Sequence, residues 1–163
     1  MKKTFKKILK EQNGIGLVEV IAALGISVVV ITSLLSLTLF SLRTSLQSTL
    51  LMEGTKAANT QMELVRAYRD QTTVWATFVS TVSGCTPTAT PPGCYVDIAV
   101  DPLVVRTGST STAAGGTSIL TRFYAVPKSG NTIISITVQS TWSVGGQNKE
   151  TFVYTDLTNW QQK

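Results

Sequence analysis

The 163-residue chain contains no histidine and only two cysteines, and charged residues make up 14% of it. Without histidine it lacks the commonest general base and a preferred metal ligand, and two cysteines supply too few ligands for structural zinc. Neither a nucleophile elbow nor a phosphate-binding glycine loop occurs. We therefore expect no enzyme, no cofactor and no metal site. A catalytic site built from carboxylates alone is the enzymatic alternative that stays open.

The chain carries an excess of positive charge, but that excess is concentrated at the N-terminus. The formal net charge is +5, and residues 1–14 hold five lysines and one glutamate. Residues 15–163 therefore keep 9 basic against 8 acidic residues, a net charge of +1. Beyond residue 70 no basic stripe with interleaved aromatic residues occurs, so nucleic acid is not an expected partner.

The longest hydrophobic run covers residues 14–42 and contains one charged residue, Glu19. From Val20 to Leu42 there are 23 apolar or small polar residues before the next charge, Arg43. Such a run is long enough to cross about 30 Å of hydrocarbon as a helix. Because a carboxylate inside a lipid-spanning helix costs about 2.5–3.5 kcal/mol, we expect Glu19 to have a partner or a function.

The lysines ahead of this run predict its orientation in a membrane. A basic cluster beside a span stays in the cytoplasm, which sends the C-terminal bulk of the chain across the membrane. A secretory signal peptide would have a shorter apolar core and a small-residue cleavage site, and neither is seen. Hydropathy alone thus indicates an uncleaved single-span anchor in the cytoplasmic membrane, with the C-terminus outside the cytoplasm.

The junction between the basic leader and the span has a more specific pattern. Gly14 is followed by the apolar Ile15, then by Gly16-Leu17-Val18, and Glu19 is the fifth residue after Gly14. Over residues 1–45 this resembles the leader of type IV prepilins and type II secretion pseudopilins. The resemblance implies that a prepilin peptidase cuts after Gly14 and methylates the new N-terminus at Ile15. It also implies that Glu19 acts in filament assembly.

The same resemblance implies a structural subunit of a type IV pilus or pseudopilus. Its partners would be other pilin subunits, the prepilin peptidase and the inner-membrane assembly platform, and it would move from the cytoplasmic membrane into the filament. The segment GLVEVIAALGI, residues 16–26, is most similar to PilV-type minor pilins and minor pseudopilins. The alternative is an uncleaved, single-span membrane-anchored extracytoplasmic binding domain.

An acid at position 19 has a physical use in a filament. Cleavage after Gly14 would create a positive amine at Ile15, which a filament buries away from water. Pairing that amine with Glu19 of a neighbouring subunit would offset the desolvation of both charges. Alternatively, Glu19 reaches the lipid headgroups or neutralises the N-terminus of its own chain.

The helix is expected to continue beyond the membrane, because no proline occurs before Pro87. Residues 43–82 predict an amphipathic extension that stays helical to about Val79. Gly54 is its weakest point, since an interior glycine costs about 1 kcal/mol relative to alanine. The expected apolar face consists of Leu46, Leu50, Ala57, Met62, Leu64, Val65 and Tyr68.

The only cysteines, Cys85 and Cys94, flank a loop rich in threonine and proline. Because the expected topology places them outside the cytoplasm, a disulfide is favoured over two free thiols. The bridge would close a loop of about ten residues, a constraint of roughly 2.5–3 kcal/mol in the chain-entropy model.

Strand patterns follow the second cysteine. Alternation over residues 132–144 places Ile134, Ile136 and Val138 on one face, and a GGQNKE turn joins this strand to 151–158 in a hairpin. Residues 107–117 are expected to form a low-complexity loop. Further strands are expected over residues 94–100, 102–107 and 118–127.

The expected fold class is α+β. It has a long N-terminal α-helix, membrane-spanning in its first half, and a small antiparallel β-sheet packed on its distal half. The expected segments are a cleaved leader (1–14), a transmembrane or filament-core helix (15–42), the amphipathic extension (43–82), and a head with the disulfide loop and sheet (83–163).

Overall fold

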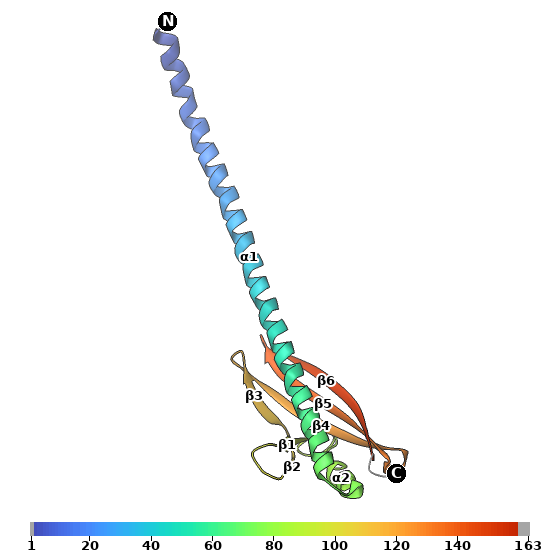
Figure 1. The fold of residues 1–163 in the computed structure, drawn as a ribbon. Coiled ribbons are helices and arrows are strands. Elements are labelled where there is room, and N and C mark those ends of the chain that lie inside the picture. Colours follow the sequence, from blue (N-terminus) through green and yellow to red (C-terminus); the bar gives the residue numbers. More distant parts are fainter. Residues whose placement is uncertain (1, 160–163) are drawn as a thin grey trace. The chain divides into compact units, whose positions relative to one another are not determined.

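The computed structural model describes residues 2–159 of the chain, with the side chains of residues 16–159. The chain divides into two compact units, Met1–Ser45 and Leu46–Lys163. Helix α1 (Lys2–Gln71) supplies the first unit and the opening segment of the second (Figure 1). The fold is α+β, as the sequence predicts, with an apolar N-terminal helix and an antiparallel sheet packed against its later part.

Within the second unit, one face of α1 is buried. Its buried residues recur every three or four positions, the spacing of one face of a helix. Of the residues predicted for this face, Leu46 is 42% exposed, while Ala57, Leu64 and Tyr68 are half-buried. The buried residues are Leu50, Gly54, Ala58, Gln61, Met62 and Val65.

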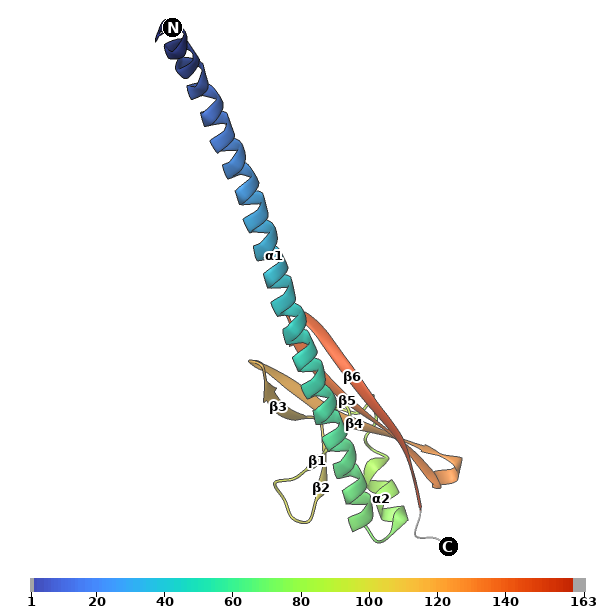
Figure 2. The same ribbon diagram turned by 45° about the horizontal axis from the view of Figure 1, so that its top comes forward.

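Helix α1 ends at Gln71, so the prediction that it continues to about Val79 is wrong. The backbone N–H of Thr72 donates to the carbonyls of Tyr68 and Arg69, and a new helix, α2 (Trp75–Val82), begins three residues later. Two threonines and a valine occupy the break, and β-branched residues are poor helix formers. The break allows α2 to lie beside the last turns of α1, as Figure 2 shows.

The break also brings three aromatic rings together. The ring centroids of Tyr68 and Phe78 are 6.1 Å apart, and those of Trp75 and Phe78 are 5.3 Å apart. Phe78 is fully buried. A single straight helix would place Phe78 almost three turns from Tyr68, so the packing of these rings depends on the break.

The sheet has six antiparallel strands in the order β2-β1-β4-β5-β6, with β3 also paired to β4. The predicted hairpin of the last two strands is confirmed, with Ile134 opposite Leu157. The strands are β1 (Cys94–Asp97), β2 (Val104–Thr107), β3 (Thr110–Ala114), β4 (Thr117–Lys128), β5 (Ile133–Val144) and β6 (Gln147–Thr158).

Strand β3 lies where the sequence predicts a loop. Its residues are serine, threonine and alanine, so it lacks the apolar alternation that marks a strand. Gly115 and Gly116, with φ of 54° and 77°, form the two-residue turn that returns the chain to β4. Two consecutive positive φ values match the hairpin turn that suits twisted strands, so the turn rather than hydrophobicity defines β3.

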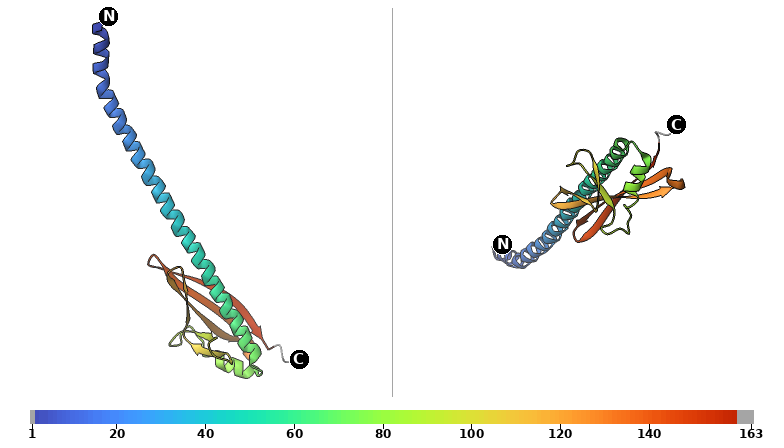
Figure 3. Two further views of the ribbon diagram at one scale, coloured as in Figure 1. Left: turned by 60° about the vertical axis from the view of Figure 1, so that its left-hand side comes forward. Right: turned by 90° about the horizontal axis from the view of Figure 1, so that it is seen from below.

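One face of the sheet covers α1, and the other faces away from it (Figure 3). In β5, Ile134, Ile136 and Val138 are buried, as the alternation predicts. The predicted shared face of Phe152 and Tyr154 in β6 is the outer one, where they are 39% and 68% exposed.

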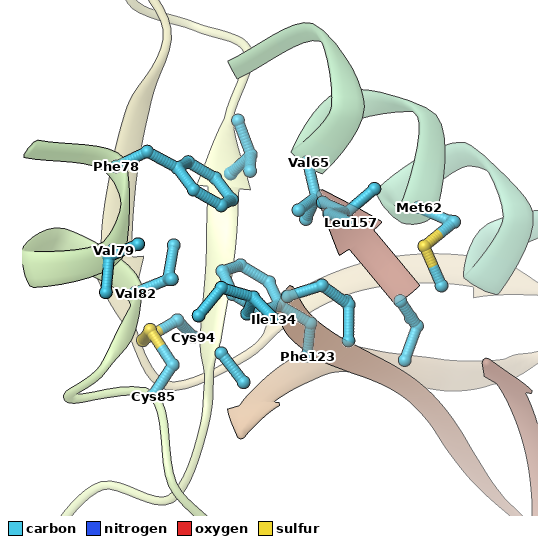
Figure 4. Packing of buried hydrophobic residues seen from close by; sticks show 14 of the residues in the cluster. Met62, Val65, Phe78, Val79, Val82, Cys85, Cys94, Phe123, Ile134 and Leu157 are labelled. Atoms are coloured by element: carbon cyan, nitrogen blue, oxygen red, sulfur yellow. A yellow bond between two sulfur atoms is a disulfide. The ribbon is translucent and has the colours of Figure 1, made fainter. Parts of the chain in front are cut away.

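The main core joins both helices to the sheet (Figure 4). Met62 and Val65 come from α1, Phe78 and Val82 from α2, and all four side chains are at most 2% exposed. Burying each side chain of this size contributes about 1.5–3 kcal/mol. A second cluster, nearer the start of the unit, contains Leu50, Ile119 and Trp142.

Gly54 lies against the indole ring of Trp142. A Cβ atom added at Gly54 would come within 2.6 Å of Trp142 Cζ3 and within 3.1 Å of two further ring atoms. Trp142 is 5% exposed, so the ring is confined. The helix runs through Gly54 without interruption, and the absence of a side chain there allows close approach of the sheet.

We expect Gly54→Ala to lower the stability of the full chain, although alanine is the better helix former. Overpacking a confined site costs about 1–3 kcal/mol, which exceeds or cancels the gain of about 1 kcal/mol in helix propensity. Thermal unfolding in detergent micelles would measure the change. Gly84→Ala is the matched control, because a Cβ there meets nothing within 4 Å. A Gly54→Ala variant more stable than this control would contradict the explanation.

Candidate membrane, assembly and disulfide sites

From Gly16 to Ser45, α1 presents apolar side chains that are exposed in the described part of the chain. From Gly16 to Thr49 every residue is exposed, and none of the most hydrophobic window is buried. Leu24 is 61% exposed and Phe40 is 67% exposed. The helix is long and apolar enough to cross a membrane. Such a continuous apolar surface is unstable in water, so it requires lipid or other apolar helices around it.

Several hydroxyl groups in this segment donate to carbonyls of the same helix. Thr32 donates to the carbonyl of Val28 at 2.9 Å, and Ser33 donates to that of Val29 at 2.8 Å. Because these hydroxyls already have acceptors, they can enter hydrocarbon without leaving polar groups unpaired. The same pattern, a hydroxyl bonded to the carbonyl four residues earlier, recurs at Ser27, Ser36 and Thr38.

Glu19 is the only charged residue between Gly16 and Leu42. It is exposed on α1, and among the side chains that the structure describes it has no ion-pair partner. Ile15 lies four residues earlier in the same helix, which places the two on one face. The side-chain surroundings of Gly14 and Ile15 lie outside the described residues. Cleavage after Gly14 and assembly through Glu19 therefore stay predictions.

The expected disulfide between Cys85 and Cys94 is confirmed. The two Cα atoms are 5.2 Å apart, and the cysteines are 1% and 2% exposed. Cys94 pairs with Phe123 of β4, and the carbonyl of Cys85 accepts a hydrogen bond from the backbone N–H of Ala125. The β4 partners of the two cysteines, Phe123 and Ala125, are thus two residues apart. The disulfide joins the segment after α2 to β1 at the edge of the core.

Gln61 is a buried polar residue whose role the sequence did not reveal. Its Oε1 accepts a hydrogen bond of 3.2 Å from the backbone N–H of Val96 in β1. Strand β1 pairs with β4 only at Cys94, because β3 pairs with β4 from Thr117 to Thr121. The helix side chain supplies an acceptor that β4 does not offer to Val96. A polar residue within the apolar stripe of α1 was the only sequence signal.

Two carboxylates of the head are held in their charged form. Asp97 accepts hydrogen bonds from the backbone N–H of Ala99 at 2.9 Å and from Arg106 Nε at 2.7 Å, which lower its pKa below the ordinary 3.8. The pKa of Asp156 is lowered by the Ser135 hydroxyl and by Lys128. Their contribution to stability is therefore present above the unfolded-state pKa and is lost only as the pH falls below it. These pairs join strands, which fits a solvated face.

No protein-family model, curated protein or solved structure matches this chain. Among the residues that the structure describes, no group of three or more acidic or cysteine side chains is arranged to hold a metal ion. The functional interpretation therefore depends on the residues of the chain itself: an exposed apolar stretch of helix that contains one carboxylate, and a head that contains a disulfide.

We expect the bridged chain to be more stable than the reduced one by roughly 2.5–3 kcal/mol, since the disulfide restricts the unfolded state of a ten-residue loop. Denaturant unfolding of the same protein with and without reductant would measure this difference at unchanged side-chain volume. Mass spectrometry without reduction should show Cys85 and Cys94 joined within one chain. Full alkylation of both cysteines in untreated material would contradict the expectation.

The double variant Cys85→Ala and Cys94→Ala serves as the control for this measurement. Reductant should leave its stability unchanged, because no bridge remains to be broken. Its insertion into membranes should match that of the unmodified chain, since insertion depends on residues 1–45.

Proposed function

We propose that this chain is a structural subunit of a type IV pilus or related pseudopilus, of the minor-pilin kind. In this proposal it is made as a membrane precursor and is cleaved after Gly14 by the prepilin peptidase. It then enters the filament through α1. The architecture supports the proposal, because a membrane-capable helix that continues into a small antiparallel sheet is pilin-like.

The observation that carries the proposal is one carboxylate, Glu19, in the exposed and otherwise uncharged stretch of α1 from Gly16 to Leu42. Glu19 lies five residues after the glycine that ends the basic leader, and no described side chain neutralises it. In a lipid-facing helix an unpaired charge costs about 2.5–3.5 kcal/mol. In a filament of packed helices, the Ile15 amine of a neighbouring subunit supplies the opposite charge.

The partners follow from this arrangement. The exposed apolar residues of α1 would pack against the same helices of other pilin subunits. The basic leader would be read by the peptidase on the cytoplasmic side, and the assembly platform of the inner membrane would move the subunit into the filament. The confirmed disulfide supports a head outside the cytoplasm, because such bridges persist in oxidising compartments.

A membrane-anchored binding domain that stays in the bilayer is the other candidate for the same architecture. It would use α1 as a simple anchor, and nothing in it requires a glycine at position 14 or an acid at position 19. The N-terminal residue of the mature protein separates the two candidates. Only the pilin-like subunit is expected to begin at Ile15.

We expect Gly14→Val to leave a full-length precursor in the membrane of cells that contain a prepilin peptidase. A bulky side chain at the residue before the cut would prevent the peptidase from accepting the site. N-terminal sequencing and gel mobility would report the length of the protein. Gly25→Val is the control: it lies in the same helix, a Cβ there meets nothing within 4 Å, and cleavage should proceed normally. Assembled filaments whose subunits still begin at Met1 would refute the processing step.

We expect Glu19→Ala to be inserted and cleaved normally but to enter filaments poorly. Insertion is kept because the span becomes more apolar. Assembly is reduced because removing one partner of a buried charge pair costs about 3–5 kcal/mol. Co-purification with the major subunit of sheared filaments, at equal membrane levels, would measure incorporation.

Glu19→Asp tests the geometry of the same pair. It keeps the charge but shortens the side chain by one methylene, so its incorporation should be intermediate. If Glu19→Ala is incorporated as well as the unmodified protein, the pairing hypothesis fails. Glu19 would then be a residue whose side chain reaches the lipid headgroups.

A further inference from the structure

The loop between the two cysteines has an unusual composition for a protein surface. Residues 86–93 read TPTATPPG, with three threonines, three prolines and no charged residue. Protein surfaces normally carry many charged side chains, which keep them hydrated. Segments rich in threonine and proline are typical of polypeptide that carries O-linked sugars.

The structure presents this loop outward from a fixed base. Cys85, Gly93 and Cys94 are buried, whereas Thr88 and Thr90 are exposed. Backbone hydrogen bonds close the loop internally, because Ala89 and Gly93 both donate to the carbonyl of Thr86, at 3.3 and 3.0 Å. The loop is therefore held by the disulfide and by its own backbone, while Thr88 and Thr90 are exposed to solvent.

The exposed hydroxyl groups of this loop differ from those of the long helix. On α1, the half-buried Thr55 and the exposed Thr60 each donate to a carbonyl one turn earlier, at 2.8 and 2.9 Å. The hydroxyl of Thr88 contacts only that of Thr86, at 3.2 Å. That of Thr90 has no hydrogen bond among the described residues. These two hydroxyls stabilise little of the fold and are free to react.

The segment next to the loop is also rich in hydroxyl groups and poor in charge. Gly108 lies against Pro91, since a Cβ added at Gly108 would meet Pro91 Cγ at 3.5 Å. From Gly108 the chain continues through a serine- and threonine-rich stretch to Thr121 without a charged residue. An attached sugar would hydrate this surface, since neither residues 86–93 nor residues 108–121 carry a charged side chain of their own.

We propose that Thr88 and Thr90 are acceptors for O-linked glycosylation. The donor is a sugar activated as a diphosphate ester, on a nucleotide or on a polyprenyl lipid. The threonine Oγ1 attacks the anomeric carbon, and a new C1–Oγ1 bond forms as the bond from C1 to the phosphate oxygen breaks. The hydroxyl proton passes to a base of the transferase, and the diphosphate leaves. The proposal rests on export of the head, which is part of the proposed function, but not on filament assembly.

The test is peptide mass spectrometry of the full chain, isolated from the cells that make it. Trypsin releases the loop in the peptide that spans residues 70–106, since no lysine or arginine lies between Arg69 and Arg106. We expect this peptide to carry one or more hexose or N-acetylhexosamine increments. Fragmentation that preserves side-chain groups should place them at Thr88, Thr90 or both. A loop peptide of unmodified mass, or sugars only on other residues, would overturn the proposal.

Matched variants separate the acceptors from the rest of the surface. Thr88→Val with Thr90→Val should remove the increment completely, because valine has the shape of threonine without its hydroxyl. Thr60→Val, an exposed position on α1, should leave the increment unchanged. An intact Cys85–Cys94 bridge in the double variant shows that loss of the sugar does not come from misfolding. Retention of the full increment in the double variant would contradict the assignment.

The same spectra separate this proposal from the proposed function. An unmodified loop in a chain that begins at Ile15 overturns glycosylation and leaves the pilin-like subunit standing. A modified loop in a chain that still begins at Met1 does the reverse.

Discussion

The packing of one face of α1 on the inner face of the sheet is the interaction on which the rest of the head depends. Gly54 lets Trp142 approach the helix at one end, and Met62 and Val65 enter the main core farther along. Neither surface could remain exposed alone, because each is a continuous apolar stripe. The second helix, the disulfide and β1 are all placed around this contact.

The two parts of α1 differ in whether their apolar side chains are buried within the chain. Residues 46–71 bury an apolar face inside their own chain, and a buried glutamine even completes the hydrogen bonding of β1. Residues 16–45 bury nothing, and hydroxyls such as those of Thr32 and Ser33 donate to carbonyls within the helix. A helix with such a surface is stable in lipid or among similar helices. In either surrounding a single carboxylate is costly unless it is paired, so Glu19 is the residue that needs a partner.

The disulfide loop is firmly anchored at its two cysteines, but the residues between them contribute little to the core. Strand β4 fixes both cysteines, so the loop between them contributes little further to the core. Loops held in this way tolerate variation and attached groups without loss of the fold. Groups attached to this loop would therefore not disturb the packing of α1 on the sheet.

The sequence by itself determined the membrane-capable helix, the fold class, the final hairpin and the cysteine pair. The length of the apolar run and the alternation of apolar residues can be read locally, and the expected location outside the cytoplasm favours the disulfide. Only the tertiary structure decided the break at residues 72–74, the strand at Thr110–Ala114 and the roles of Gly54 and Gln61. The break forms because Phe78 gains a buried site against Tyr68, and β3 forms because a glycine turn returns the chain to β4. Gly54 and Gln61 acquire their roles from Trp142 and Val96, partners far away in the sequence, which no local pattern can identify.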